Sequence, residues 1–260
     1  MKMIHKYFFP VIAPVIFLLL WEVSVSLGWV RGVILPAPSE IGITLLDLLQ
    51  TGELCENLIV SILRVAKGFV IGMTFGILLG IQTALSTLFR QSMQFIFGIL
   101  RPIPVIAWIP IVILWLGIDE TSKVAIISIG SFWAVFVSVV QAIRHVDPKY
   151  IEVARVLGKG RGNIIRGVIL PAALPEIFTG VRIGIDVAWR SVIAAEMIAA
   201  SAGVGYMIMY ARELSQTDTV LVGMLAIGLT GSAIELIVRW MEKRILHWKL
   251  DGTQGGGKNL

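Results

Sequence analysis

Six long apolar runs recur along this 260-residue chain, and they constrain its fold more than any other feature. Hydrophobic residues make up 57% of the chain and charged residues only 15%, whereas a typical soluble domain has about 25% charged residues. A chain of this composition cannot cover itself with polar surface in water. We therefore interpret it as an all-α, polytopic membrane protein, because each run is long enough to cross a bilayer as a helix. The runs fall at about residues 7–27, 58–85, 93–116, 124–143, 176–200 and 218–240.

Basic residues flank these runs and predict the orientation of the chain. The first run follows Lys2 and Lys6, and the last precedes Arg239, Lys243 and Arg244. Because cytoplasmic loops carry an excess of Lys and Arg, both termini are predicted to be cytoplasmic. A cleaved signal peptide is the alternative for the first run, but this run contains Glu22 and lacks an A-x-A cleavage site. We expect six transmembrane helices in one domain, residues 1–260, with a disordered tail at 250–260.

The loop at residues 144–175 is rich in Lys and Arg, so it too is predicted to be cytoplasmic. Asp147 and Pro148 suit the start of a short helix, and Gly158 suits its left-handed C-terminal cap. Asn163 is predicted to cap a second helix that ends near Pro171. Apolar residues at helical spacing predict a face for docking another protein, formed by Ile151, Val153, Ala154 and Leu157. A plain cytoplasmic loop would need no such order.

Charged residues inside the apolar runs are candidates for a translocation pathway, because each is costly in lipid. Four of them lie in the fifth run and are predicted to form one polar stripe facing the bundle interior: Arg182, Asp186, Arg190 and Glu196. Asp186 and Arg190 are four residues apart and can pair along one helix face. Two interpretations remain open for the stripe: a neutralised network that packs the bundle, or the lining of an anion pathway.

Prolines and glycines predict breaks and close contacts in these helices. Pro102 and Pro104 must break the third run next to Arg101, which either faces a cavity or lies at the membrane interface. Two series of small residues mark helix faces for close packing: Gly68, Gly72, Gly76 and Gly80 in the second run, and Gly180, Gly184 and Ala188 in the fifth. Residues 29–57 are expected outside, with Ser39 capping a short amphipathic helix.

Motifs for catalysis or metal binding are missing from the sequence. Cys55 is the only cysteine, and neither H-E-x-x-H nor G-x-S-x-G occurs. Gly252–Lys258 spells G-x-x-x-x-G-K, but Asn259 follows where a phosphate loop needs Ser or Thr. We therefore expect no catalytic residue, no metal and no bound ATP in this chain. The net charge of +5 is interpreted as topology signals and attraction to anionic lipid rather than to nucleic acid.

The loop residues resemble the signature of the membrane permease subunits of bacterial ABC importers. That signature is E-A-A, three residues, Gly, nine residues and I-x-L-P, and here Val153 and Val168 are mild departures from it. The resemblance implies contact with an ATPase through Glu152, Ala154, Leu157, Gly158, Leu170 and Pro171. It also implies the type I, MetI-like permease fold. The candidate pathway residues that accompany this interpretation are Arg101, Pro102, Pro104, Arg182, Asp186, Arg190 and Glu196.

Further stretches are similar to the sulfonate, taurine, nitrate and bicarbonate branch of that family, including residues 35–38, 101–104, 115–118, 170–175 and 195–200. The branch implies a homodimer of permeases in the bacterial inner membrane, two cytoplasmic ATPases that bind ATP and Mg²⁺, and an extracytoplasmic substrate-binding protein. The expected function is passage of a small anion into the cytoplasm. The alternative is an ion-coupled secondary transporter or channel that uses the charges of the fifth run.

Overall fold

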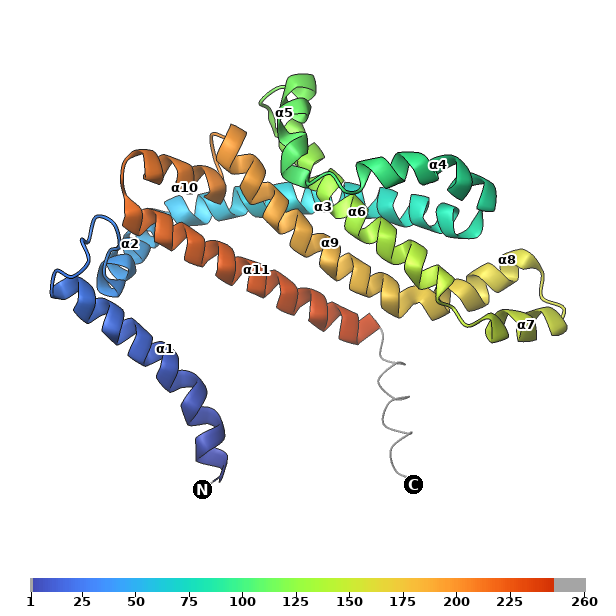
Figure 1. The fold of residues 1–260 in the computed structure, drawn as a ribbon, viewed down its shortest axis with the longest axis horizontal. Coiled ribbons are helices and arrows are strands. Elements are labelled where there is room, and N and C mark those ends of the chain that lie inside the picture. The colour runs from blue at the N-terminus through green and yellow to red at the C-terminus, as the bar shows by residue number, and fades with distance from the viewer. Residues whose placement is uncertain (1, 246–260) are drawn as a thin grey trace. The chain divides into compact units, whose positions relative to one another are not determined.

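Helices are the only regular elements in the part of the chain that the structure describes, which is residues 2–245, with side chains from residue 12 onward. This computed structural model confirms the predicted all-α class (Figure 1). The predicted disorder of residues 250–260 and the motif at Gly252–Lys258 lie outside the described residues. The elements are α1 (Lys2–Ser26), α2 (Pro38–Gln50), α3 (Glu53–Leu85), α4 (Thr87–Leu100), α5 (Val105–Leu116), α6 (Glu120–Arg144), α7 (Pro148–Val156), α8 (Arg161–Ile164), the π-helical turn η1 (Ile165–Ile169), α9 (Leu170–Ala199), α10 (Val204–Glu213) and α11 (Thr217–Ile245).

Several of these helices are long and apolar enough to cross a membrane. Four pass this test among the described residues: Glu53–Leu85, Glu120–Arg144, Arg161–Ala199 and Thr217–Ile245. Helices α4 and α5 make up a fifth candidate span, broken by a bend of 96°, and α1 contributes the shorter apolar stretch Ile12–Ser26. The six apolar runs of the sequence thus correspond to α1, α3, α4 with α5, α6, α9 and α11.

The chain divides into two compact units, and the first consists of Met1–Val60 and Ala200–Leu229. Its core joins α2 and the start of α3 to α10 and α11, through Ile41, Leu48, Leu54, Val204, Met207, Ile208, Val222 and Ala226. The hydroxyl of Thr44 donates to the Asp218 carboxylate at 2.6 Å, which fixes α2 against α11. Helix α10 was not predicted from the sequence.

The predicted capping role of Ser39 is wrong by two positions. Helix α2 begins at Pro38, where a missing amide hydrogen costs nothing, and Ala37 precedes it in extended conformation. The Glu40 carboxylate accepts a hydrogen bond from the Ala37 amide at 3.2 Å. The Ser39 hydroxyl instead donates to Glu22 of α1 at 2.7 Å. The Ser39 side chain therefore contacts α1 and does not cap α2.

The second unit, Ser61–Ala199 with Thr230–Leu260, is built on very close packing of α3, α6 and α9. A Cβ added at Gly72 would lie 2.2 Å from the Ser131 hydroxyl, and one at Gly180 would lie 2.2 Å from the Ser138 Cβ. Both predicted series of small residues are therefore confirmed as packing faces. Gly68 and Gly80 meet Ile127 and Val139 in the same order, so α3 and α6 run parallel. Gly180 and Gly184 meet Ser138 and Val135 in reverse order, so α9 runs antiparallel to α6.

Candidate functional site

The cytoplasmic loop of the sequence prediction forms a helical hairpin of α7, α8 and η1 between α6 and α9 (Figure 1). Asp147 caps α7 as predicted, because its Oδ1 accepts from the Lys149 amide at 2.9 Å. Gly158 has a φ of 71°, which is the left-handed conformation predicted for it. Its amide donates to the Arg155 carbonyl at 2.9 Å, and the Lys159 amide donates to the Ala154 carbonyl at 3.1 Å. These two bonds form a Schellman cap, which fixes the turn of the hairpin.

The two faces of α7 differ from the predicted docking face. Ala154 is buried and Ile151 packs partly buried beside it, so these residues hold α7 against a core that includes Val139 and Ile143 of α6. The large apolar side chains that the hairpin exposes are Tyr150, Val153, Val156 and Leu157, with Val156 88% exposed. Glu152 is exposed as well. The predicted docking face thus combined two residues that face the core, Ile151 and Ala154, with two exposed residues, Val153 and Leu157.

The second half of the hairpin corrects two further predictions. Helix α8 begins at Arg161 after Gly160, so Asn163 is not its cap. Pro171 does not end this helix either, because Arg161–Ala199 is continuous. The π-helical turn explains this: the Leu170 amide donates to the Ile165 carbonyl, five residues back. Pro171 then stands in the first turn after the changed register, where a proline is tolerated. Leu170 is half-buried and Pro171 is exposed.

An ionic cluster joins α3, α6 and α9 at their other end, and its side chains are buried except for that of Glu120. The Glu196 carboxylate is fully buried and accepts bonds from the Arg64 guanidinium at 2.8 Å and from the Ser61 hydroxyl at 2.8 Å. Arg64 also donates from Nε to the Glu120 carboxylate at 2.7 Å. Lys123 lies 3.4 Å from the same Glu120 carboxylate and donates to the Ile118 carbonyl. Two acidic and two basic groups balance, so the cluster is electrically neutral.

The predicted single stripe on α9 is therefore wrong as a geometric unit. Asp186 and Arg190 pair at 2.7 Å as predicted, but both side chains are more than half exposed. Arg182 pairs with Glu242 of α11 at 3.6 Å. Glu196 is six residues beyond Arg190, which turns it about 240° around the helix from that pair. Consequently Glu196 belongs to the buried cluster, whereas the Arg182, Asp186 and Arg190 side chains occupy another face.

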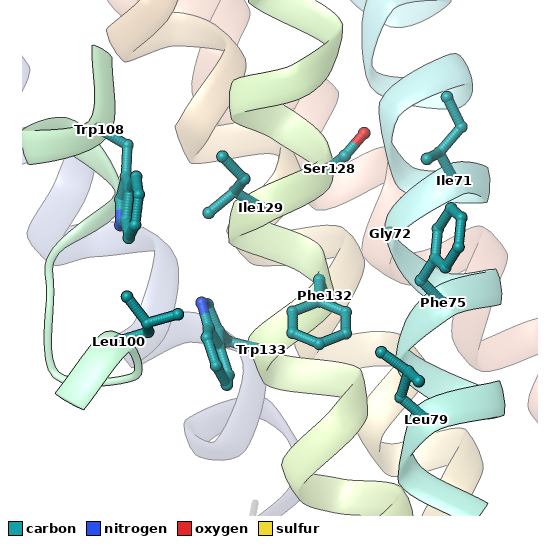
Figure 2. Close-up of a pocket in the computed structure, with 10 residues that line it drawn as sticks. All are labelled: Ile71, Gly72, Phe75, Leu79, Leu100, Trp108, Ser128, Ile129, Phe132 and Trp133. Carbon is teal, nitrogen blue, oxygen red and sulfur yellow. The ribbon is translucent and has the colours of Figure 1, made fainter. Parts of the chain in front are cut away.

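The residues of the predicted break in the third apolar run lie where the span formed by α4 and α5 bends. Arg101, Pro102 and Pro104 lie in the link between α4 and α5, where the bend of 96° confirms the predicted break. Arg101 is exposed and lines a groove between α4 and α6. Beside this groove lies an apolar cavity of about 350 Å³ (Figure 2), lined by Ile71, Gly72, Phe75, Leu79, Leu100, Trp108, Ser128, Ile129, Phe132 and Trp133. This cavity has no charged side chain in its wall, so an anion has no partner there.

Sequence reasoning did not bring Ser61, Arg64, Glu120 and Lys123 together with Glu196. A usable signal existed, because Arg64, Glu120 and Glu196 all stand near the expected outer ends of their runs. Charges at one depth in neighbouring helices are expected to pair in a membrane protein. Among the described residues, no group of three or more His, Cys, Asp or Glu side chains is placed to hold a metal ion.

Comparison with known proteins identifies the family. Residues 72–247 match the family model described as "Binding-protein-dependent transport system inner membrane component". A relative in Bacillus subtilis (strain 168), named "Putative aliphatic sulfonates transport permease protein SsuC", is 39% identical over 91% of this chain and 86% of its own length. The taurine transport system permease protein TauC of Escherichia coli (strain K12) is 34% identical over 90% of this chain and 86% of its own.

Among solved structures, a crystal structure of an amino acid ABC transporter with histidines matches 76% of this chain and 97% of its own chain. The TM-score is 0.65 at 18% sequence identity, which confirms the predicted MetI-like permease fold. The likeness to SsuC and TauC confirms the predicted resemblance to the sulfonate and taurine branch. The chain is thus a multi-pass inner membrane protein, and it belongs to the family of binding-protein-dependent transport system inner membrane components, the permease subunits of ABC importers.

Proposed function

We propose that this chain is the transmembrane permease subunit of an ATP-driven importer, which passes a small anion from an extracytoplasmic binding protein into the cytoplasm. A sulfonate such as taurine is the proposed cargo, with nitrate or bicarbonate as the competing anions. Residues 1–260 form a single permease domain with both termini in the cytoplasm. Two copies of the chain form the membrane channel, and two ATPase subunits bind ATP and Mg²⁺, because this chain has no nucleotide motif of its own.

The hairpin carries this proposal. It presents four exposed apolar side chains, Tyr150, Val153, Val156 and Leu157, beside the exposed Glu152. Exposed apolar groups next to a charge are typical of a surface that binds a partner protein. Ala154 and Leu170 support the surface from inside, Gly158 sets its turn, and Pro171 begins the helix that leaves it. In the proposed mechanism, ATP closes the two ATPases, both hairpins move with them, and the permease pair opens outward to receive the anion.

The proposed pathway uses the charges that stay accessible. Arg101 lies at the broken span, and Arg182 and Arg190 lie on α9, where Glu242 and Asp186 pair with them. Pro102 and Pro104 keep the backbone irregular where the pathway needs room. Glu196 has a different task in this proposal, because its buried pairing with Arg64 supports the walls rather than the cargo.

Glu152→Arg and Gly158→Val test the coupling role of the hairpin. We expect both variants to lose most ATP-driven uptake while the membrane level of the permease stays unchanged. Glu152→Arg reverses the charge that meets the ATPase, and Gly158→Val forces a β-branched residue into the left-handed conformation. The measurement is taurine uptake together with ATP hydrolysis by the full transporter in proteoliposomes. Uptake at the wild-type rate in both variants would contradict the proposal.

Matched controls separate coupling from general damage. A Cβ added at Gly158 meets nothing within 4 Å, so the defect arises from the backbone and not from a clash. Gly158→Asn should therefore retain most activity, since Asn tolerates the left-handed conformation. Glu213→Arg on α10, also exposed, should leave uptake unchanged. Omitting the ATPase tests the alternative of a secondary transporter or channel, which would show uptake without it.

A further inference from the structure

A groove of about 540 Å³ runs between α4 and α6 in the second unit, and its polar wall is basic. This volume is within the range of about 300–1,000 Å³ that is usual for small-molecule sites. Three arginines and two glutamines from the two helices line it, with Thr83 of α3 behind them. The polar residues are Thr83, Arg90, Gln94, Arg101, Gln141 and Arg144. No Asp or Glu lines the groove.

The three arginines have no carboxylate partner among the described residues, unlike several arginines of α3, α9 and α11. Arg64, Arg182, Arg190 and Arg239 each form an ion pair with a carboxylate. Within residues 12–245, no carboxylate pairs with Arg90, Arg101 or Arg144. The glutamines add amide donors that suit oxygen acceptors. The groove therefore holds three positively charged side chains and no carboxylate in its wall.

The position of these arginines makes an anion the fitting partner. Phe97 of α4 stacks edge-on against Trp133 and Phe136 of α6, so this end of α4 packs along the middle of α6. Arg101 is one turn further on α4, about 16 Å along the helix from Arg90. Arg101 therefore lies closer than Arg90 to the apolar middle of α6. A cation at such a place is stabilised by an opposite charge or by water in a cavity.

We propose that this groove is a binding site for a singly or doubly charged oxyanion, a phosphate or sulfonate group, held by Arg90, Arg101 and Arg144. The planar guanidinium group donates two parallel hydrogen bonds to such an oxyanion. Gln94 and Gln141 donate to its remaining oxygens. Two sources share this chemistry: the headgroup of an anionic phospholipid in the cytoplasmic leaflet, and a free sulfonate or phosphate. The site shares Arg101 with the proposed anion pathway, whereas Arg90 and Arg144 belong to the groove alone.

Native mass spectrometry of the full transporter tests the site. The probes are phosphatidylglycerol, added to delipidated transporter in neutral detergent, and free methanesulfonate or inorganic phosphate. The triple variant Arg90→Gln, Arg101→Gln, Arg144→Gln should bind the effective probe at least about tenfold more weakly than the wild type. The control triple Arg239→Gln, Lys243→Gln, Arg244→Gln removes the same charge from α11 and should bind like the wild type.

The two sources give different results, and each supports the site. Phosphatidylglycerol that stays bound in excess methanesulfonate identifies a lipid headgroup, whereas binding of methanesulfonate or phosphate alone identifies a free oxyanion. If the triple variant does not assemble, Arg101→Gln alone should show the weakening, since its side chain is exposed. Equal binding by the wild type and the groove variants, or an equal loss in the α11 control, would overturn the proposal.

Discussion

At the scale of single residues, two carboxylates on α9 show how environment decides the role of a charge. Glu196 is fully buried and accepts bonds from both Arg64 and Ser61. Asp186 is more than half exposed and pairs with Arg190 along its own helix. Removing one partner from a buried pair leaves an uncompensated charge, whereas exposed pairs contribute little. Two carboxylates on the same helix are therefore expected to contribute differently to the free energy of unfolding.

Glu196→Ala should destabilise the permease strongly, because Arg64 would keep its burial and lose one of its two carboxylates. We expect a loss of about 3–5 kcal/mol in the free energy of unfolding. The measurement is denaturant unfolding of the purified chain in detergent, followed by tryptophan fluorescence. Asp186→Ala is the matched control and should change stability by no more than about 1 kcal/mol. Equal losses in the two variants would show that burial does not govern the difference.

At the scale of elements, the contact between α3 and α6 depends on the missing side chains of one helix. A Cβ at Gly72 would lie 2.2 Å from the Ser131 hydroxyl and 2.4 Å from the Ser128 carbonyl. The carbonyl belongs to the backbone and cannot rotate away. The whole of α6 would have to shift to admit even a methyl group.

Gly72→Ala should therefore destabilise the permease by about 1–3 kcal/mol through overpacking. Gly228→Ala on α11 is the control, because a Cβ there meets nothing within 4 Å. That variant should be neutral or up to about 1 kcal/mol more stable, since alanine favours helix. Thermal unfolding of both purified variants measures the difference, and a stable Gly72→Ala protein would argue against direct α3–α6 contact.

Features set by neighbouring residues were predictable from the sequence, and features set by distant ones were not. The Asp147 cap, the Gly158 turn and the break at Pro102 and Pro104 each depend on a few consecutive residues. By contrast, the bond from Ser39 to Glu22 and the pairing of Arg64 with Glu196 join residues 17 and 132 positions apart. The π-helical turn that precedes Pro171 also escaped prediction, because no local motif in residues 165–169 indicates it.

At the scale of the whole molecule, helix direction and loop charge predict the same orientation. Helices α3 and α6 run parallel and α9 runs antiparallel, as alternating crossings require. The basic hairpin follows α6, and a short turn that carries Asp119 precedes α6, which begins at Glu120. The positive-inside rule therefore predicts that the hairpin is cytoplasmic and that the turn before α6 is external.

Cysteine labelling checks this orientation across α6. In a Cys55→Ser background, Gly160→Cys in the hairpin and Thr121→Cys in the first turn of α6 each introduce one thiol at an exposed position. A membrane-impermeant maleimide should label Thr121→Cys in intact cells. It should label Gly160→Cys only in inside-out vesicles. The reverse pattern would require the opposite insertion of the chain.

The continuity of Arg161–Ala199 has a mechanical consequence. At 1.5 Å per residue, the 36 residues from Arg161 to Glu196 extend about 50 Å. No loop interrupts this length, so one continuous helical segment, with a π-helical turn near its start, connects the hairpin to the ionic cluster. A tilt of the hairpin end would be transmitted to the other end of this helix, where Arg64 and Ser61 bind Glu196. The strength of these bonds to Glu196 would then decide how far this end of the helix moves when the hairpin end tilts.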